Sequence, residues 1–433
     1  MMLRSKRAHR PRVLMLIENV PLARDHRLRK QAAALLASQF EVTVICQRDP
    51  RNKSCVPGVR VLEYPAPPEG AGLLAFAGEY GYSVVMAGLL TVWAFFRHGF
   101  DILQVASTPD IYFLIAAPCR WLGRPVVFDF RDPSPETYQA RYGRSDGAMY
   151  RALLLLERWS LRAADCVLVV NESLRQMARQ RGGVDDARIV LVGNGPAVSR
   201  VARLPARPEL RQGRPRLCCW VGLIGPQDRV DLALEAVDHL VHVRKRTDCT
   251  FVFVGAGEAL PAARQQAADL DLGDWVSFPG WAQEELVFDY LSTADVGLEP
   301  NTEDYVSPVK VMEYLAAGLP VVAFSAEENI RLAGEAAWYA PKGNITVMAR
   351  LIDELLDDEV SRGQMGRIGQ NRVKEFIAWD HQAGPYVLAL AELLGQPPRI
   401  APGPAGGSTR KKQDREVISV TRTGLVDTDE AIA

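Results

Sequence analysis

The residues best suited to chemistry lie close together in the second half of the chain, within residues 305–320. Pro308 suits the first turn of a helix, so Ser307 would lie at the electropositive end of that helix. Lys310 and Glu313 are three residues apart and therefore share one helical face near that end. A cation there can meet a diphosphate, and a carboxylate can accept paired hydrogen bonds from vicinal ribose hydroxyls. An ordinary salt bridge between the two side chains is the other explanation, and the segment alone does not decide between them.

Three turns that contain glycine follow predicted strands. They are Gly193-Asn-Gly195, Gly222-Leu-Ile-Gly225 and Gly255-Ala-Gly257. Such turns let backbone N–H groups approach a phosphate, although strand-to-helix punctuation explains each of them equally well. The third turn lacks the last glycine of a dinucleotide fingerprint, and the chain has no Gly-Lys-Ser/Thr loop. These absences argue against a nicotinamide-linked dehydrogenase and a P-loop nucleotide hydrolase.

The composition excludes several other classes of protein. The 433 residues include 51 Lys+Arg and 52 Asp+Glu, so no global positive field is available to hold nucleic acid, and we predict no nucleic-acid partner. The seven cysteines show no Cys-x-x-Cys spacing, which predicts reduced thiols in the cytoplasm rather than a zinc site or a disulfide framework. His239 and His242 share a helical face without a third ligand nearby, so we predict no metal site.

The elements that must position these residues follow from an alternation of short apolar, β-branched runs with amphipathic helical stretches. This alternation is typical of parallel sheets covered by helices on both faces. It breaks at residues 197–215, which carry three prolines among many arginines, and then restarts. We therefore predict an α/β fold with two doubly wound, Rossmann-like domains and a cleft between them. The expected parts are a basic arm at 1–12, a first domain at 13–200, a linker at 201–216, a second domain at 217–378, a helix at 379–396 that crosses back to the first domain, and a disordered tail at 397–433.

One stretch, residues 71–96, has enough apolar residues to cross a membrane. It also contains Glu79 and four glycines, so a buried or interfacial pair of helices is the favoured interpretation. Contact with a lipid-linked acceptor is the functional alternative.

Residues 13–395 as a whole resemble glycosyltransferase family 4, the retaining nucleotide-sugar enzymes of the two-domain GT-B fold. The order and spacing of several motifs together make the resemblance specific, although each motif is loose by itself. The motifs are Asp25-His-Arg27, Phe128-Asp-Phe-Arg-Asp132-Pro-Ser-Pro-Glu136, Val221-Gly222-Leu-Ile-Gly225-Pro-Gln-Asp228, Val252-Phe-Val-Gly255-Ala-Gly257, Phe278-Pro-Gly280 and the segment from Ser307 to Pro320.

The resemblance implies a donor site mainly in the second domain, with no metal and no cofactor besides the nucleotide-sugar co-substrate. Glu313 matches the second of the family's paired acids and is expected to hold the donor ribose, whereas Tyr305 stands where the first acid is usual. Leu223 stands where the first cation of a phosphate-binding pair is usual, which leaves Arg229 and Lys310 as candidate cations. The donor-binding residues implied in this way are Gly222, Gly225, Arg229, Gly255, Gly280, Ser307, Pro308, Lys310 and Glu313.

On the acceptor side, Asp132 and Glu136 match an acidic motif of the family in which a histidine commonly precedes the aspartate. This chain has Arg131 there, and a guanidinium that stays charged cannot act as a general base. Asp132 is therefore the better candidate to orient or deprotonate an acceptor hydroxyl. Asp25 and Arg27 complete the predicted acceptor-binding set, although Asp25 is equally well explained as the N-cap of a helix.

Together these features predict transfer of a sugar, with retention, from a nucleotide diphosphate sugar to a hydroxyl of a lipid-linked, polysaccharide or small-molecule acceptor. Asp132 and Lys310 are the predicted catalytic residues. A nucleotide-sugar 2-epimerase and a non-catalytic sugar-nucleotide-binding scaffold remain as alternatives. The expected location is the cytoplasm, with peripheral contact at the inner face of the membrane left open.

Overall fold

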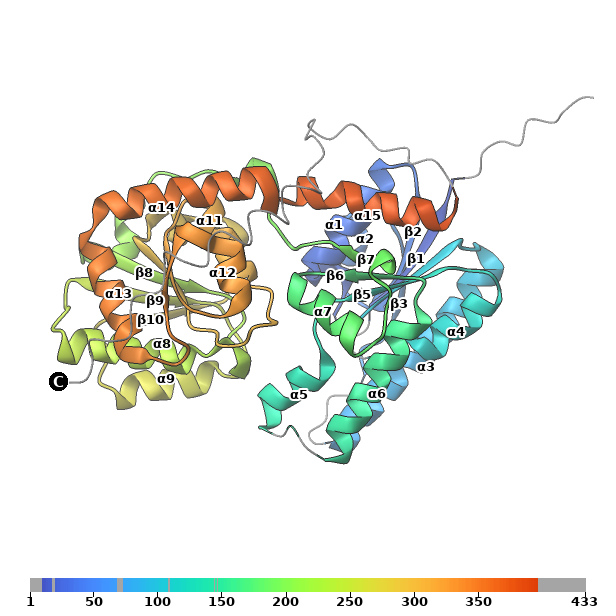
Figure 1. Ribbon diagram of the computed structural model, residues 1–433, viewed down its shortest axis with the longest axis horizontal. Coiled ribbons are helices and arrows are strands. Elements are labelled where there is room, and N and C mark those ends of the chain that lie inside the picture. The colour runs from blue at the N-terminus through green and yellow to red at the C-terminus, as the bar shows by residue number, and fades with distance from the viewer. Residues whose placement is uncertain are drawn as a thin grey trace, which may run out of the picture. The chain divides into compact units, whose positions relative to one another are not determined.

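The computed structural model describes residues 10–17, 20–67, 73–107, 110–143, 145 and 147–395. These residues form two compact units (Figure 1). Unit 1 contains the described residues up to Gly193 and those from Gln382 onward, and unit 2 is Asn194–His381. The chain therefore enters unit 2 after Gly193 and returns to unit 1 within its last helix. The predicted tail at 397–433 and residues 1–9 of the predicted basic arm lie outside the described residues.

Unit 1 is built on a seven-stranded sheet in the order β3-β2-β1-β4-β5-β6-β7, in which all neighbours are parallel. Its central strands are fully buried and mostly apolar, as expected where helices cover both faces. The strands are β1 (Arg12–Leu16), β2 (Glu41–Gln47), β3 (Arg60–Tyr64), β4 (Ile102–Ala106), β5 (Val126–Phe130), β6 (Cys166–Val169) and β7 (Ile189–Leu191).

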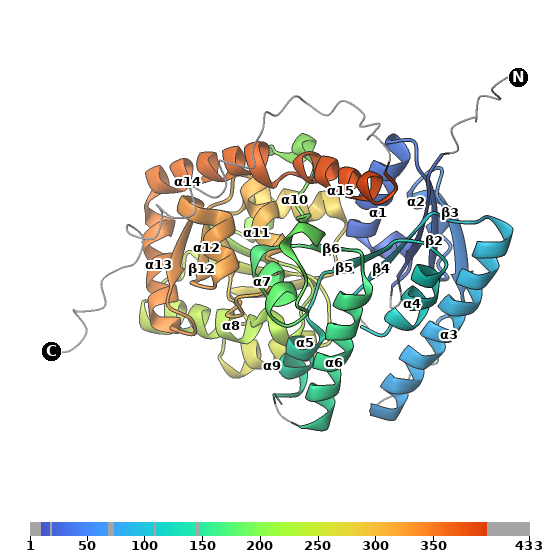
Figure 2. The ribbon, with the colours of Figure 1, turned by 45° about the vertical axis from the view of Figure 1, so that its right-hand side comes forward.

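The helices of unit 1 lie on both sides of this sheet (Figures 1 and 2). On one side, Gln104 of β4 bonds to Gln31 of the first helix and to Tyr386 of the last helix, at 2.9 and 2.7 Å. The helices are α1 (His26–Ala37), α2 (Asn52–Cys55), α3 (Leu73–Arg97), α4 (Phe113–Trp121), α5 (Ser134–Tyr142), α6 (Ala148–Ala163), α7 (Glu172–Gln180) and α15 (Trp379–Leu393). Of these, α3, α4 and α6 lie on the side opposite to α1 and α15.

Unit 2 has a six-stranded parallel sheet in the order β10-β9-β8-β11-β12-β13. Its strands are β8 (Arg216–Val221), β9 (Cys249–Val254), β10 (Val276–Gly280), β11 (Val296–Glu299), β12 (Val321–Phe324) and β13 (Ala337–Ala340). Its helices are α8 (Val230–Asp238), α9 (Leu260–Asp269), α10 (Glu284–Thr293), α11 (Val309–Ala316), α12 (Glu327–Ala333), α13 (Ile345–Asp357) and α14 (Glu359–Arg372). The strand order reverses direction at β8 and β11, the switch point where doubly wound sheets bind ligands. The predicted α/β class with two doubly wound sheets is confirmed.

The expected pair of helices at residues 71–96 is wrong: the described part of this stretch forms the single helix α3. Gly78, Gly81 and Gly88 lie inside it, where a side chain on any of them would meet no atom closer than 3.9 Å. Glycine lowers helix propensity without blocking helical geometry, so packing against the rest of unit 1 can keep the helix continuous through these positions.

The predicted linker at 201–216 is mostly exposed and is anchored to unit 2 by arginines. Arg203 donates to the carbonyls of Ser292, Ala294 and Gly318, and Arg211 pairs with Asp295 at 2.6 Å. These bonds explain why the segment belongs to unit 2 and why the arginines cluster among its prolines.

Candidate functional site

Two glycine turns pack against each other at the carboxyl ends of β8 and β9 in unit 2. Gly222 and Gly255 have φ values of 151° and 155°, which L side chains rarely adopt. A Cβ atom on Gly255 would lie only 1.8 Å from the carbonyl oxygen of Gly222. The amide nitrogens of Gly222, Gly225 and Gly255 donate to acceptors within the protein, namely Val254, Leu223 and Gly280. The glycines are therefore required for close packing of the turns, and these three amides are already bonded.

Lys310 of α11 reaches the same end of the sheet. Its ammonium lies 2.8 Å from Asp228 Oδ1 and 3.5 Å from Glu299 Oε2, and 4.8 Å from the ring centroid of Trp220. A Cβ atom on Gly222 would lie 3.1 Å from Lys310 Cε, so the absent side chain leaves room for the lysine. The side chain of Lys310 is only 12% exposed. The structure thus places a largely buried cation against the Gly222 turn.

The charges around Lys310 do not balance, because two carboxylates share one ammonium. Burial raises the pKa of Glu299 above its usual value, and the opposing charge of Lys310 does not fully offset that effect. Burial alone would lower the pKa of Lys310, but the charges of Glu299 and Asp228 outweigh it and raise that pKa. Lys310 therefore stays an ammonium, whereas Glu299 is the group that most readily takes up a proton.

The other predicted donor residues also lie in unit 2, but their partners differ from those of Lys310. Arg229 has a left-handed backbone, with φ of 50°, and pairs with Asp231 at 2.9 Å. Pro308 is the residue before α11, which begins at Val309, so the helix starts one residue later than predicted. The buried Ser307 hydroxyl has no hydrogen-bond partner in the described part of the chain.

Glu313 lies one turn further along α11 than Lys310. It lines a small cavity with Arg200 and with Phe288 of α10. Gly280 ends β10 with φ of 83° and accepts the bond from the Gly255 amide. The structure therefore brings Lys310, Gly222 and Gly255 together, whereas Arg229 is engaged by its own neighbour on α8.

In unit 1, two of the predicted acceptor residues, Arg27 and Arg131, converge on a carboxylate that the sequence did not single out. Asp129 is the second-last residue of β5 and is fully buried; it accepts hydrogen bonds from Arg27 at 2.7 Å, Arg131 at 2.8 Å and Gln31 at 3.1 Å. Burial opposes its ionisation, but the charges of Arg27 and Arg131 outweigh that effect and hold the pKa of Asp129 below its usual range. Asp25 is the N-cap of α1 through the amide of Leu28, and it also bonds Arg131.

Asp132 and Glu136 lie just beyond this network. The amide of Asp132 donates to the Ser107 hydroxyl at 3.3 Å, and the residue is exposed. Burial of the carboxylate raises the pKa of Asp132 and outweighs the lowering by the charges of Arg131 and Arg27, although the residue as a whole is exposed. Glu136 forms a two-bond ion pair with Arg181. Asp132 is thus an exposed acid, whereas Arg27 and Arg131 are committed to Asp129.

Comparison with known sequence families agrees with this geometry. Residues 25–195 match the family described as "Glycosyl transferase 4-like domain", and residues 215–358 match "Glycosyl transferases group 1". The two matches follow unit 1 and unit 2 in order. The chain is a GT-B glycosyltransferase of the group 1 and family 4 type. The predicted family and the predicted enzyme class are confirmed.

This glycosyltransferase is similar to several characterised proteins. The α-D-kanosaminyltransferase of Streptomyces kanamyceticus is 25% identical over 48% of this chain, and the chain covers 55% of that relative's length. Sucrose-phosphate synthase of Thermosynechococcus elongatus has the same fold, with a TM-score of 0.74, 17% identity and coverage of 89% of this chain and 100% of that one. HepE of Anabaena in complex with UDP-glucose has a TM-score of 0.68 and 17% identity, with coverage of 88% and 99%.

Four residues of these sites were missed in the sequence: Trp220, Asp228 and Glu299 in unit 2, and Asp129 in unit 1. Asp129 and Glu299 share a signal, because each is an acid within the last two residues of a short, otherwise apolar run that becomes a buried strand. Asp228 was part of a quoted motif without a role. Among the described residues, no group of three or more His, Cys, Asp or Glu side chains could hold a metal ion.

Proposed function

We propose that the glycosyltransferase moves a sugar from a nucleotide diphosphate sugar to a hydroxyl group, with retention at the anomeric carbon. The observation that carries the proposal is the Lys310 ammonium held against the Gly222 turn at the carboxyl ends of β8 and β11. A buried cation at a strand switch point suits the leaving diphosphate of such a donor. The UDP-glucose complex of HepE, which has the same fold, supports a donor of this class.

In this proposal, Lys310 stabilises the charge that develops on the leaving diphosphate. Its ion pairs with Asp228 and Glu299 hold the ammonium in place before the donor binds, so little reorganisation is needed during the reaction. The buried Ser307 hydroxyl and the N-terminus of α11 add hydrogen-bonding capacity and positive potential beside it. Glu313, on the same helix, would bind the donor ribose through paired hydrogen bonds.

For the acceptor, we propose that Asp132 orients or deprotonates the attacking hydroxyl. Its raised pKa makes it a stronger base than an ordinary aspartate, and its exposure leaves it accessible. Arg27 and Arg131 would act indirectly, because they fix the end of β5 from which Asp132 projects. The proposed acceptors are lipid-linked, polysaccharide or small hydroxyl compounds, and the reaction is proposed to need no metal and to run in the cytoplasm.

Calorimetry with UDP, GDP, ADP and dTDP tests the donor site in the full chain. Lys310→Met alone would leave Glu299 buried without a cation, so the test variant is Lys310→Met combined with Glu299→Gln. We expect one nucleotide to bind the wild type, and the double variant to bind it about 10- to 100-fold more weakly, as for loss of a charge-assisted hydrogen bond. Lys374→Ala, an exposed lysine of unit 2, is the matched control and should bind normally.

Turnover of the matching nucleotide sugar, with EDTA present, then tests the chemistry. The product is expected to keep the anomeric configuration of the donor in its NMR spectrum, and turnover is expected to survive the chelator. An inverted product, or a folded wild type that binds none of the four nucleotides, would contradict the proposal. A 2-epimerised sugar in the absence of acceptor would support the epimerase alternative instead.

A further inference from the structure

Helix α3 carries large apolar side chains on its solvent-exposed face, where a helix that covers a soluble core normally carries polar ones. Val85, Leu89, Val92, Trp93 and Phe96 recur at helical spacing, and all five are exposed, up to 82% for Phe96. The residues that face the sheet are small or polar instead: Ser83, Ala87, Thr91 and Ala94 are buried. A helix of a soluble domain normally shows the reverse pattern. The outer face of α3 is therefore apolar without a partner among the described residues.

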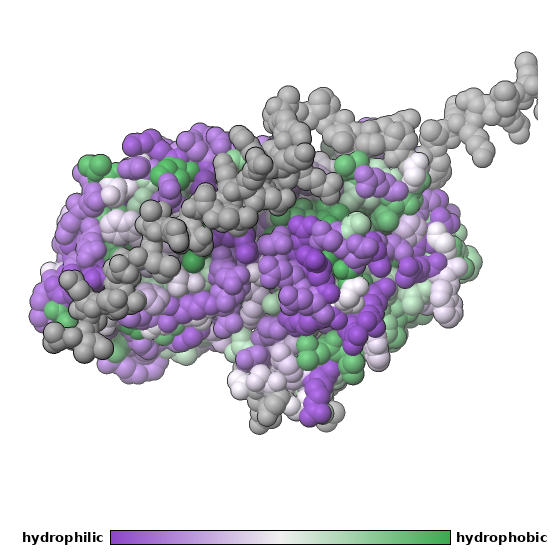
Figure 3. All heavy atoms as spheres, in the orientation of Figure 1, coloured by the Kyte–Doolittle hydropathy of each residue, from purple (hydrophilic) through white to green (hydrophobic). Residues whose placement is uncertain are grey.

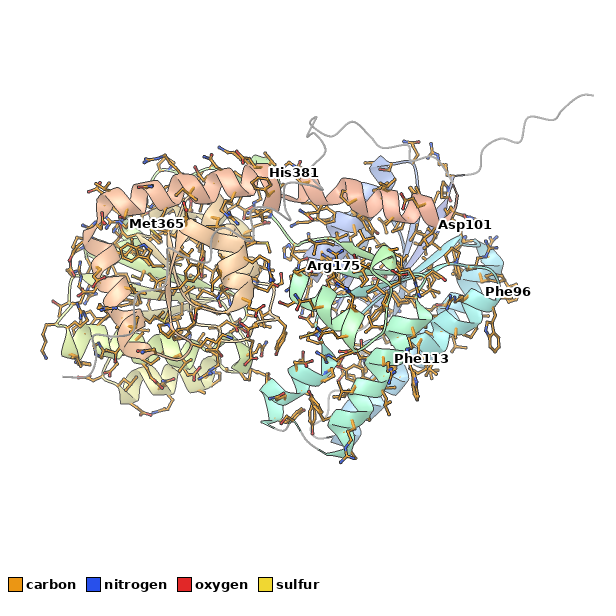
Figure 4. The ribbon with its side chains drawn as sticks, in the orientation of Figure 1. Phe96, Asp101, Phe113, Arg175, Met365 and His381 are labelled. Carbon is orange, nitrogen blue, oxygen red and sulfur yellow. The ribbon has the colours of Figure 1, made fainter. Side chains whose placement is uncertain are left out.

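Two neighbouring helices extend this apolar face. A Cβ atom on Gly88 of α3 would lie 3.9 Å from Ile115 of α4, and the rings of Phe113 on α4 and Trp159 on α6 lie 5.5 Å apart. Figure 3 shows hydrophobic side chains over the region where Figure 1 draws α3 and α6, and Figure 4 labels Phe96 and Phe113 there. We call the exposed set the α3–α4–α6 surface; it consists of Val85, Leu89, Val92, Trp93, Phe96, Leu114, Trp121, Leu122, Leu155 and Trp159.

The tryptophans of the chain are distributed in a way that distinguishes this surface. Of the eight, the three in unit 1 are Trp93, Trp121 and Trp159, and all three belong to the α3–α4–α6 surface. Trp121 is 91% exposed. Tryptophan is enriched where proteins meet the headgroup region of a membrane, because its ring is apolar and its indole N–H can still bond to water or lipid.

The charge on these helices has one sign. In the described side chains of α3, α4 and α6, every exposed charged residue is an arginine, and the two acids, Glu79 and Glu157, are half-buried and buried. Arg120 also pairs with Asp165 at 2.9 Å. The arginines are Arg97, Arg120, Arg151, Arg158 and Arg162. Arginine can place its apolar stem along a membrane surface while its guanidinium binds lipid phosphate.

We propose that the α3–α4–α6 surface binds an anionic lipid bilayer, with α3 lying in the plane of the interface. The segment Gly78–Arg97 is long and apolar enough to cross a membrane, and 22% of its most apolar window is buried. However, its inner face packs on the sheet of unit 1, which favours a helix that lies on the bilayer. A second copy of the chain fits less well, because a two-fold interface would bring like-charged arginines together.

This inference extends the proposed function without depending on it. A bilayer-bound unit 1 would hold the enzyme on the membrane in which lipid-linked acceptors are anchored. Binding to vesicles needs no donor and no turnover. A failure of the bilayer proposal and a failure of the glycosyl-transfer proposal can therefore be told apart.

Co-sedimentation of the full chain with vesicles tests the proposal. One set of vesicles contains phosphatidylcholine alone, and the other contains phosphatidylcholine mixed with phosphatidylglycerol. We expect binding to the anionic vesicles that weakens with salt, and a loss of about tenfold or more in Leu89→Gln/Phe96→Gln. Both side chains are exposed, so folding should be unaffected, and Trp281→Gln/Val360→Gln is the matched control on unit 2.

A second pair of variants tests the charge. Arg151→Gln/Arg158→Gln should weaken binding to anionic vesicles, whereas Arg264→Gln/Arg367→Gln, with the same change in net charge on unit 2, should not. Brominated lipid should quench the fluorescence of the wild type but not that of the triple variant Trp93→Phe/Trp121→Phe/Trp159→Phe. Absence of wild-type binding, or equal loss in the control pairs, would overturn the proposal. A dimer in light scattering that Leu89→Gln/Phe96→Gln dissociates would assign the surface to a second copy.

Discussion

Buried ion clusters lie at the carboxyl ends of strands in both units, but their proportions of cation to carboxylate differ. In unit 1, the guanidiniums of Arg27 and Arg131 hold Asp129, and the pKa of this acid is lowered; Arg131 also pairs with Asp25, so two cations face two carboxylates. In unit 2, the one ammonium of Lys310 is shared by Asp228 and Glu299, and the pKa of Glu299 is raised. A carboxylate that is matched by cations is part of the scaffold. A cluster with excess carboxylate can exchange one of its partners for a ligand.

The largest loss of stability is expected from Asp129→Asn, which leaves two largely buried guanidiniums without their common carboxylate. Breaking a buried ion pair from one side typically lowers the free energy of unfolding by about 3–5 kcal/mol. Urea unfolding followed by circular dichroism measures the change. Asp186→Asn, which breaks an exposed pair with Arg175, is the control and should cost about 1 kcal/mol or less. Equal effects of the two substitutions would show that the unit 1 cluster is not a scaffold.

The fold could be predicted from the sequence, whereas the choice of ion-pair partners could not. The alternation of short apolar runs with amphipathic stretches predicted two doubly wound sheets, and both are present, because strand burial depends on local pattern. Lys310 was placed on one helical face with Glu313 by its spacing. The structure adds partners from other elements, including Asp228, which lies 82 residues away in sequence. No local pattern specifies a contact between elements that only the folded sheet brings together.

A third ion cluster, around Arg181 in unit 1, tests how the ratio of cations to carboxylates affects stability at different pH. Arg181 pairs with both Glu157 and Glu136, and burial raises the pKa of Glu157 to about 8 and that of Asp110 to about 7. At pH values between the pKa of each acid in the unfolded chain and its raised pKa in the folded protein, the folded state holds a proton that the unfolded state has released. The free energy of unfolding should therefore fall as pH rises from about 5 to about 8, by at most about 1.4 kcal/mol per pH unit for each group.

Thermal and urea unfolding across this pH range measure the slope, and Glu157→Gln isolates one of the two groups. The slope should become shallower in Glu157→Gln and stay unchanged in Glu392→Gln, an exposed glutamate of α15. A wild type whose stability rises over the same range would mean that Arg181 suffices to keep both acids ionised. In that case, the ratio of cations to carboxylates would not explain the behaviour of the clusters.

The smallest effect is expected on the affinity of unit 2 for a nucleoside diphosphate, because the diphosphate must share Lys310 with two carboxylates. Because the pKa of Glu299 is raised, we expect this group to take up a proton when a nucleoside diphosphate binds, which removes the repulsion and releases the ammonium. Affinity should then increase as pH falls, by less than about tenfold per pH unit for uptake of at most one proton. Calorimetry in buffers of different ionisation enthalpy counts the protons directly.

Glu299→Gln separates this effect from protonation of the nucleotide itself, because the phosphate titrates identically in both proteins. The variant should bind the nucleotide at least as tightly as the wild type, with less proton uptake and a flatter pH profile. Its stability should change by about 1 kcal/mol or less, since the remaining Lys310–Asp228 pair keeps one carboxylate for one cation. Weaker binding in Glu299→Gln would show instead that Glu299 positions Lys310 as a permanent partner. The two units would then hold their buried cations in the same way, and the contrast between them would lie only in their pKa values.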